Sequence, residues 1–291
     1  AYYAGSVGKY VIEDLCRIPV EADLASELRY RNPLVDEHTL LVVVSQSGET
    51  ADTIAAMKEC KARGARVLAI VNVVGSTIAK LADDVLYTWA GPEIAVATTK
   101  GYTTQVAVLD LLAVYLARRL GRLDDQRYRA LVKAIEQFPS LVQRAIDLNP
   151  NLPALAEKYH GYNDIFFLGR NLDYAASMEG SLKLKEISYL HSEAYAAGEL
   201  KHGTIALIEK GTLVMALATQ EALMEKSLSN FKEVKARGAY VVAVVQEHHK
   251  HLLEKDVDLV LTIPDAGDMF APLLAVLFYQ LYGYYTAVLK G

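Results

Sequence analysis

Short runs of aliphatic and β-branched residues recur along the chain, separated by stretches with helical spacing. In the first half, helices are expected at 50–63 and 99–120. Alternation of strands and helices predicts an α/β fold, with mostly parallel sheets flanked by helices. The runs expected to form strands are 40–44, 67–71, 85–88, 165–168, 213–217, 240–245 and 259–263.

The chain repeats itself. KECKARGARVLAIVN, from Lys58, and KEVKARGAYVVAVVQ, from Lys232, are identical at ten of fifteen positions, with an offset of 174. EADLASEL, from Glu21, matches EAYAAGEL, from Glu193, with an offset of 172. We interpret the chain as an internal duplication of one α/β unit. A turn-rich LNPNLP stretch then divides it into residues 1–147 and 148–291.

The first unit lacks a counterpart of the strand expected at 165–168. An offset of 174 would place that counterpart before Ala1. A parallel sheet without this strand would have unpaired backbone groups at its edge. We therefore expect the chain to be a fragment, with the first strand of its first unit missing.

A hydroxyl-rich turn, SQSGET at 45–50, directly follows the first expected strand. The hydroxyls of Ser45, Ser47 and Thr50 could donate to phosphate oxygens beside the N–H groups of a helix start. Gly48 would let the backbone approach closely. The alternative is a Ser/Thr helix cap with a capping-box glutamate, which is a common structural device.

The second copy of this turn reads TQEALM, at 219–224. It has lost the serines and the glycine and has gained a carboxylate, so the fold itself does not require the hydroxyl set. This divergence favours a binding site in the first unit. A nucleotide site is a weak interpretation, because neither a P-loop lysine nor a GxGxxG follows a strand.

A second polar group lies in the run from Met178 to Gly203. Glu179, Lys183 and Glu186 fall at i, i+4 and i+7, which places them on one face of a helix. An exposed Glu–Lys ladder is one interpretation. Neighbouring leucines favour partial burial instead, and a partly buried carboxylate beside a lysine can transfer protons. His202 adds an imidazole that can titrate near neutral pH.

Composition and charge argue against several classes of protein. A net charge of −5 and a pI near 5.8 argue against nucleic-acid binding. Two distant cysteines, Cys16 and Cys60, indicate a reduced, cytoplasmic protein without disulfides. The apolar segment from Met269 contains proline and several tyrosines, so we expect a core or dimer-interface helix and no membrane span. EHHKHLLEK, from Glu247, lacks a complete ligand set, and we expect no metal.

Three motifs carry a family resemblance: SQSGETADT at 45–53, GPEIAVATTKGYTTQ at 91–105 and LKLKEISYLHSEAYAAGELKHG at 182–203. They resemble the isomerase half of glucosamine-6-phosphate synthases, a tandem of two sugar-isomerase (SIS) domains. The resemblance extends over essentially the whole chain. It implies that fructose 6-phosphate and glutamine-derived ammonia give glucosamine 6-phosphate, without a cofactor.

The resemblance also implies roles for individual residues. Ser45, Gln46, Ser47 and Thr50 would hold the sugar phosphate, and Val96 would line the sugar pocket. Glu186 would move a proton between C1 and C2, Lys183 would exchange hydroxyl protons, and His202 would open the sugar ring. Those two sets are the substrate-binding and the catalytic residues that we expect. In the family the histidine reaches a neighbouring subunit's site, which implies a homodimer.

Some family features are missing from the sequence. The glutaminase half, with its N-terminal cysteine, is expected elsewhere in the parent chain, as is a C-terminal tail that carries a lysine. A serine of the family stands where this chain has Ala1. Two other functions stay open: a stand-alone sugar-phosphate isomerase or deaminase, and a non-catalytic sugar-phosphate sensor. A sensor would not need Lys183, Glu186 and His202 together.

Overall fold

The computed structural model describes residues 1–162 and 164–291, and the chain divides into two compact units, Ala1–Asp125 and Gln126–Gly291. The predicted boundary, 147/148, differs because helix α6 (Asp125–Asp147) belongs almost wholly to the second unit. Phe138, Leu141 and Val142 of α6 pack against that unit's core. The turn-rich stretch therefore follows the first helix of the second unit.

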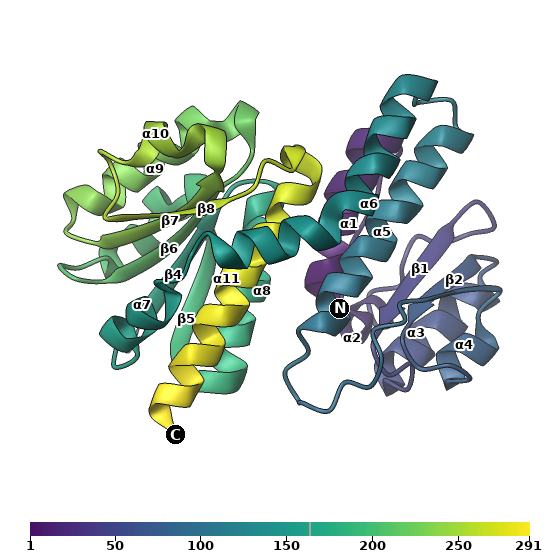
Figure 1. Cartoon of the computed structure of the whole chain (residues 1–291). Helices are drawn as coiled ribbons and strands as arrows, with labels where there is room; N and C mark the ends of the chain where they lie inside the picture. Colours follow the sequence, from purple (N-terminus) through teal and green to yellow (C-terminus); the bar gives the residue numbers. More distant parts are fainter. Residues whose placement is uncertain (163) are drawn as a thin grey trace. The chain divides into compact units, whose positions relative to one another are not determined.

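The first unit contains one parallel sheet in the order β1-β2-β3. A core cluster built from β1, β2, α3 and α4 fills one face of the sheet, while α1 and α5 pack together on the other (Figure 1). The elements are α1 (Tyr2–Cys16), α2 (Ala25–Leu28), β1 (Leu40–Ser45), α3 (Ala51–Ala62), β2 (Arg66–Val71), α4 (Thr77–Leu81), β3 (Asp84–Tyr87) and α5 (Lys100–Arg119).

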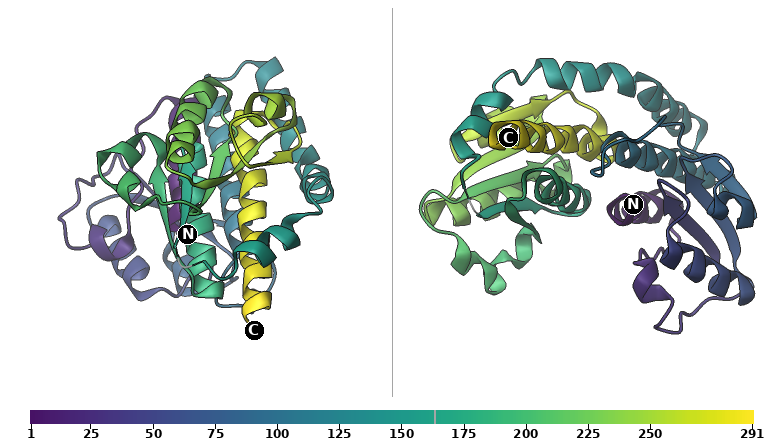
Figure 2. Two further views of the ribbon diagram at one scale, coloured as in Figure 1. Left: turned by 90° about the vertical axis from the view of Figure 1, so that its left-hand side faces the viewer. Right: turned by 90° about the horizontal axis from the view of Figure 1, so that it is seen from below.

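The second unit contains a parallel sheet in the order β5-β4-β6-β7-β8. Helices α7, α8 and α11 cover one face and α9 covers the other, with a core cluster on each side (Figures 1 and 2). The elements after α6 are α7 (Leu152–Tyr159), β4 (Asp164–Gly169), α8 (Leu172–Ser188), β5 (His191–Ala196), η1 (Ala197–His202), η2 (Thr204–Leu207), β6 (Leu213–Ala218), η3 (Glu221–Leu223), α9 (Met224–Ala236), β7 (Tyr240–Gln246), η4 (Glu247–His249), α10 (Lys250–Leu253), β8 (Leu259–Ile263) and α11 (Gly267–Lys290).

The predicted α/β class and parallel sheets are confirmed, and all seven expected strands form. The central strand β6 is buried along its whole length, which explains its continuous apolar sequence. Strand β5 was not predicted. Its sequence, HSEAYA, lacks an apolar run, and it pairs only with β4 at the sheet edge. The related segment of the first unit, Glu21–Leu28, forms only α2, because no β4 equivalent exists among the described residues.

The two units repeat specific polar contacts. In the first, Lys61 Nζ lies 2.6 Å from Asp83 Oδ1, and a β2 N–H donates to the same carboxylate at 2.8 Å. In the second, Lys235 lies 2.6 Å from Asp258, and a β7 N–H donates to that carboxylate at 2.7 Å. The lysines and the strand N–H groups are 174 residues apart and the aspartates 175, so the sequence offset, within one residue, corresponds to equivalent positions in the two units.

Helix α11 is, among the described residues, the one helix long and apolar enough to cross a membrane. Its side chains Phe278, Tyr279 and Tyr282 are completely buried in the core of the second unit. It runs along α8, where Gly180 allows the contact: a Cβ there would lie 2.2 Å from Tyr279 Cδ2. In this structure α11 is a core helix.

Candidate functional site

The hydroxyl-rich turn connects β1 to α3 in the first unit. Ser45 is buried at the end of β1, and Gly48 adopts φ +68°. A Cβ on Gly48 would lie 2.2 Å from Ser76 Oγ, so only glycine fits this close approach. The Gly48 N–H donates to Ser45 Oγ at 3.0 Å, and the Glu49 N–H donates to Ser47 Oγ at 3.2 Å.

These contacts leave the hydroxyl protons available. A hydroxyl that accepts a backbone N–H can still donate its own proton, so Ser45 and Ser47 remain potential donors to an anion. Thr50 precedes α3, yet its side chain makes no capping hydrogen bond with any residue that the structure describes. Glu49 instead accepts the N–H of Thr77 at 2.8 Å, and this bonding lowers the pKa of Glu49. The alternative of a capped helix start is therefore wrong for Thr50.

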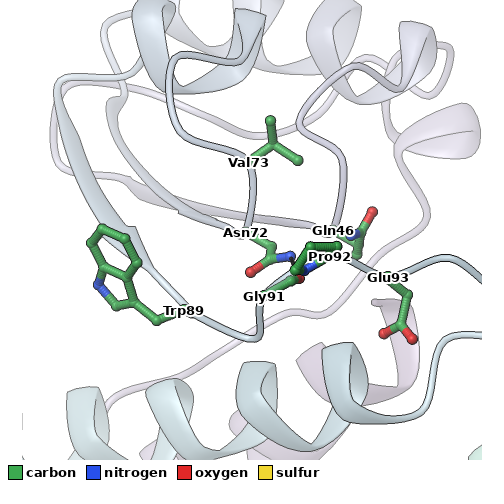
Figure 3. A pocket seen from close by; sticks show the side chains of 7 residues that line it. All are labelled: Gln46, Asn72, Val73, Trp89, Gly91, Pro92 and Glu93. Carbon is green, nitrogen blue, oxygen red and sulfur yellow. Dashed lines mark hydrogen bonds between the residues drawn. The ribbon is translucent and has the colours of Figure 1, made fainter.

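A pocket of about 460 Å³ opens beside the turn, where β1, β2 and β3 end (Figure 3). This is the sheet edge at which parallel α/β folds bind ligands. Of the five residues expected to bind the substrate, Gln46 alone lines this pocket, and the Val96 side chain is fully exposed. The lining residues are Gln46, Asn72, Val73, Trp89, Gly91, Pro92 and Glu93.

Asn72 and Glu93 fix the loop that closes this pocket, and sequence reasoning missed both. Asn72 Oδ1 accepts the N–H of Ala90 at 2.9 Å, while its amide donates to the Gly91 carbonyl at 2.8 Å. Glu93 accepts the N–H of Gly101 at 3.0 Å, at the start of α5. A signal was available for Asn72, which ends a strand-like run and aligns with Gln246 in the duplication.

The second group of candidate residues lies on α8. As predicted, Glu179, Lys183 and Glu186 share one side of the helix. Lys183 Nζ pairs with Glu186 and lies 3.5 Å from Glu179 Oε1. Glu179 and Lys183 are each 1% exposed, whereas the Glu186 side chain is 30% exposed. The lysine therefore joins an interior carboxylate to one that faces solvent.

Burial sets the protonation of Glu179. Removal from water raises the pKa of Glu179 to about 7, although the charge of Lys183 opposes this shift. Sequence reasoning placed Glu179 on the stripe but gave it no role, because spacing alone does not tell which carboxylate is buried. With Lys183 and Glu186 it forms a row of three ionisable groups in direct contact along one side of α8.

His202 ends η1 and is exposed, immediately before Gly203 with φ +137°. Over residues 1–162 and 164–291, His202 makes no hydrogen bond or ion pair with Lys183 or Glu186. The structure therefore brings Lys183 and Glu186 together but leaves His202 outside their contacts.

The described residues do not contain a cluster of three metal-ligating side chains.

Comparison with known proteins places this geometry in a family. The SIS domain model matches residues 1–115 and 158–286. The chain belongs to the SIS domain family. The tandem of two SIS domains that the resemblance implied is thereby confirmed.

Particular relatives narrow the resemblance within the SIS family. Glutamine–fructose-6-phosphate aminotransferases (isomerizing) of Clostridium tetani and Caldanaerobacter subterraneus are 55% and 57% identical over 291 residues. These matches cover 100% of this chain and 48% of each relative, so the chain spans about half the length of the curated relatives it matches. The predicted resemblance to the isomerase half is confirmed.

Solved structures of related proteins show the same similarity. The C-terminal domain of glucosamine-fructose-6-phosphate aminotransferase from Francisella tularensis is 37% identical, with a TM-score of 0.96, and the match covers 100% of this chain and 82% of that one. Glucosamine-6-phosphate deaminase from Thermotoga maritima is 25% identical, with a TM-score of 0.78 and coverage of 100% and 83%.

Proposed function

We propose that this chain is the isomerase domain of a glutamine–fructose-6-phosphate aminotransferase and converts fructose 6-phosphate and ammonia to glucosamine 6-phosphate. The observation that carries the proposal is the contact of buried Lys183 with Glu186 on α8, in a chain that matches these enzymes over all 291 residues. The ammonia would come from the glutaminase domain of the same parent chain.

In this proposal the phosphate binds at the turn. Ser45, Ser47 and Thr50 donate hydroxyl protons to its oxygens, and Gln46 contributes its amide. Val96 lines the sugar pocket in the bound state. Held at one end, the substrate has its C1 and C2 oriented for the reaction, which is how binding away from the reacting atoms lowers a barrier.

The chemical steps assign one role to each group. His202 assists ring opening, after which ammonia adds to the C2 carbonyl and water leaves, giving an imine. Glu186 takes a proton from C1 and returns it to C2, while the C1 hydroxyl gives up its proton and the imine nitrogen gains one. C2 then carries the amino group, and C1 is the aldehyde. Lys183 exchanges protons with sugar hydroxyls. Atoms and charge balance without a cofactor.

Two further features are part of the proposal. The chain forms a homodimer, in which exposed His202 serves the site of the partner subunit. The protein is cytoplasmic, which is supported by Cys16 and Cys60 being buried and free.

Product formation tests the main proposal. The chain is incubated with fructose 6-phosphate and an ammonium salt, and glucosamine 6-phosphate is measured by mass spectrometry. We expect wild type and the matched surface control Glu225→Gln to form product, while Glu186→Gln loses roughly 100-fold or more in rate. Equal rates for Glu186→Gln and Glu225→Gln would remove Glu186 from the mechanism.

The same assay separates the second candidate, a stand-alone deaminase or isomerase, which the similarity to the Thermotoga maritima deaminase supports. A deaminase would release ammonia from glucosamine 6-phosphate faster than it forms the amino sugar at matched concentrations. A sensor would bind the sugar phosphate without turnover, in wild type and in Glu186→Gln alike.

A further inference from the structure

The second unit has its own copy of the hydroxyl-rich turn, and that copy is hydrogen-bonded within the unit. With the offset of 174, Thr219 corresponds to Ser45, and it follows β6 as Ser45 ends β1. Asp173, in the first turn of α8, is 1% exposed. Its carboxylate accepts the N–H of Thr219 at 2.8 Å and the hydroxyl proton of Thr219 at 2.5 Å.

The other groups at this turn are also engaged. The Gln220 side-chain amide donates to Thr219 Oγ1 at 3.2 Å and to the Asp268 carbonyl at 2.8 Å. The Gln246 amide donates to the Thr219 carbonyl at 2.8 Å. Burial raises the pKa of Asp173 to about 7, while hydrogen bonds from Thr219 and Gln220 oppose the rise. The Asp173 carboxylate thus accepts the hydrogen bonds that this turn offers.

The first unit differs at this point. With the offset of 172, Asp173 corresponds to Ala1, whose side chain carries no carboxylate. Ser45 Oγ accepts a backbone N–H there, and among the described residues its own proton has no acceptor, so it can donate to a ligand. The same turn position is therefore open to a substrate anion in one unit and used internally in the other.

The hydrogen bonds between Asp173 and Thr219 hold α8, the helix that carries the candidate catalytic groups. Asp173, Ser177 and Ser181 follow one another at four-residue spacing. Ser177 Oγ donates to the Leu168 carbonyl at 3.2 Å, and Ser181 Oγ lies 3.0 Å from Ser192 Oγ. These buried bonds attach α8 to β6, β4 and β5 in turn.

The start of α8 is held especially close. A Cβ on Gly169, at the end of β4, would lie 2.3 Å from the Asp173 backbone carbon. Asn171 precedes the helix with φ +53° and ψ −124°, a positive-φ conformation that is strained for a side-chain-bearing residue. The bonds to Thr219 stabilise this tight entry into the helix.

We propose that Asp173 is a positioning residue: by binding Thr219 it fixes the start of α8, and so sets where Lys183 and Glu186 meet the substrate. The proposal rests on the function proposed above. Displacing a catalytic group by about 1 Å can cost about 100-fold in rate. Because the turn at Ser45–Thr50 belongs to the other unit, substrate affinity should change little.

The test compares variants of the Asp173–Thr219 pair with a matched buried control. Thr219→Val removes the hydroxyl donor at nearly constant shape, and Thr219→Ser retains it. Asp173→Asn weakens the acceptor. Asp110→Asn, in α5, is the control, because Asp110 is 2% exposed and its carboxylate has no hydrogen-bond partner among the described residues.

Two readouts are measured on the chain: kcat and KM for fructose 6-phosphate with ammonium, and amide hydrogen exchange along α8. We expect Thr219→Val and Asp173→Asn to lower kcat about 10- to 100-fold, with KM within about threefold, and to speed exchange in the first two turns of α8. Thr219→Ser should restore both readouts, and Asp110→Asn should change neither.

Unchanged kcat in folded Thr219→Val would overturn the positioning role, as would a loss of kcat that Thr219→Ser fails to rescue. If Asp173→Asn does not fold, the comparison of Thr219→Val with Thr219→Ser still tests the positioning role. If wild type forms no product, the proposed function has failed, and hydrogen exchange alone decides whether Asp173 anchors α8: equal exchange in Thr219→Val and Thr219→Ser would exclude it.

Discussion

Lys183 Nζ lies 3.5 Å from Glu179 Oε1, and both side chains are almost completely buried within α8. The buried carboxylate has no hydrogen-bond donor on Oε1 in the described chain, so the lysine is its main compensation. Lys183 also pairs with Glu186, nearer the surface. Lys183 therefore contacts a buried carboxylate and a partly exposed one at the same time.

Glu179→Gln should change how stability depends on pH. The folded pKa of Glu179, about 7, is raised above its ordinary value of 4.5. Its stabilising effect is therefore complete below the unfolded pKa and is lost as pH rises through the folded pKa. The variant should remove a slope of up to about 1.4 kcal/mol per pH unit between these values. Urea unfolding from pH 4 to pH 8 measures it.

The control for this prediction is Glu225→Gln, which removes an exposed glutamate of α9 and should leave the slope as in wild type. Asp173, also with a pKa of about 7, titrates in the same window, so the informative quantity is the difference between wild type and variant. Parallel curves for Glu179→Gln and wild type would show that Glu179 is not protonated on folding.

Gly48→Ala should abolish binding of the sugar phosphate. An alanine Cβ would meet Ser76 Oγ at 2.2 Å and displace the turn. Glucosamine 6-phosphate at 100 times its dissociation constant should add about 2.7 kcal/mol to wild-type stability, a melting shift of roughly 2–4 °C. We expect this shift to vanish in Gly48→Ala.

Gly75→Ala is the matched control for the turn. Gly75 also has a positive φ, +74°, but a Cβ there would meet nothing within 4 Å. Both variants suffer left-handed strain, and only Gly48→Ala adds the clash. Retained binding in Gly48→Ala, or lost binding in both variants, would argue against the turn as the phosphate site. Unphosphorylated glucosamine should shift none of the proteins.

Thr50→Val should separate binding from folding. Because the Thr50 hydroxyl makes no capping bond in the described part of the chain, its loss should change stability by no more than about 0.5 kcal/mol. If its hydroxyl donates to phosphate, the variant should lose part of the melting shift with glucosamine 6-phosphate. Thr53→Val, one turn into α3, should keep the full shift. A destabilised Thr50→Val with normal binding would restore the helix-cap interpretation.

The sequence specified most of the fold, because buried parallel strands such as β6 and β7 are continuous apolar runs. Strand β5 was not predicted, because an edge strand with one partner needs no continuous apolar run. The boundary between the two units was predicted at a different residue for another reason. The apolar residues of α6, such as Phe138, do not indicate which core they join, since packing between distant segments decides it.

The candidate site was only partly predictable. Helical spacing placed Lys183 and Glu186 together, since local geometry is sufficient for residues three apart. The burial of Glu179 depends on tertiary packing around α8, which helical spacing alone does not reveal. The contribution of Asn72 depends on loop contacts at the end of β3. The duplication, which aligns Asn72 with Gln246, was the one sequence signal for it.

Mixing two inactive variants tests whether His202 serves the partner subunit. If the chain forms the proposed homodimer, the His202→Asn and Glu186→Gln variants should each be inactive alone. In mixed dimers, however, one site would combine an intact Glu186 with the other chain's intact His202. Random exchange makes half the dimers mixed, each with one intact site of two, so activity should return to roughly a quarter of wild type.

This complementation has a sharp control, because it depends on which chain supplies each residue. Lys183 and Glu186 lie on the same helix and in direct contact, so Lys183→Ala mixed with Glu186→Gln should regain no activity: in mixed dimers every copy of α8 carries one defect. Activity regained with Lys183→Ala would indicate reconstitution by another route. No recovery with His202→Asn, in dimers verified as mixed by native mass spectrometry, would place His202 in the site of its own chain.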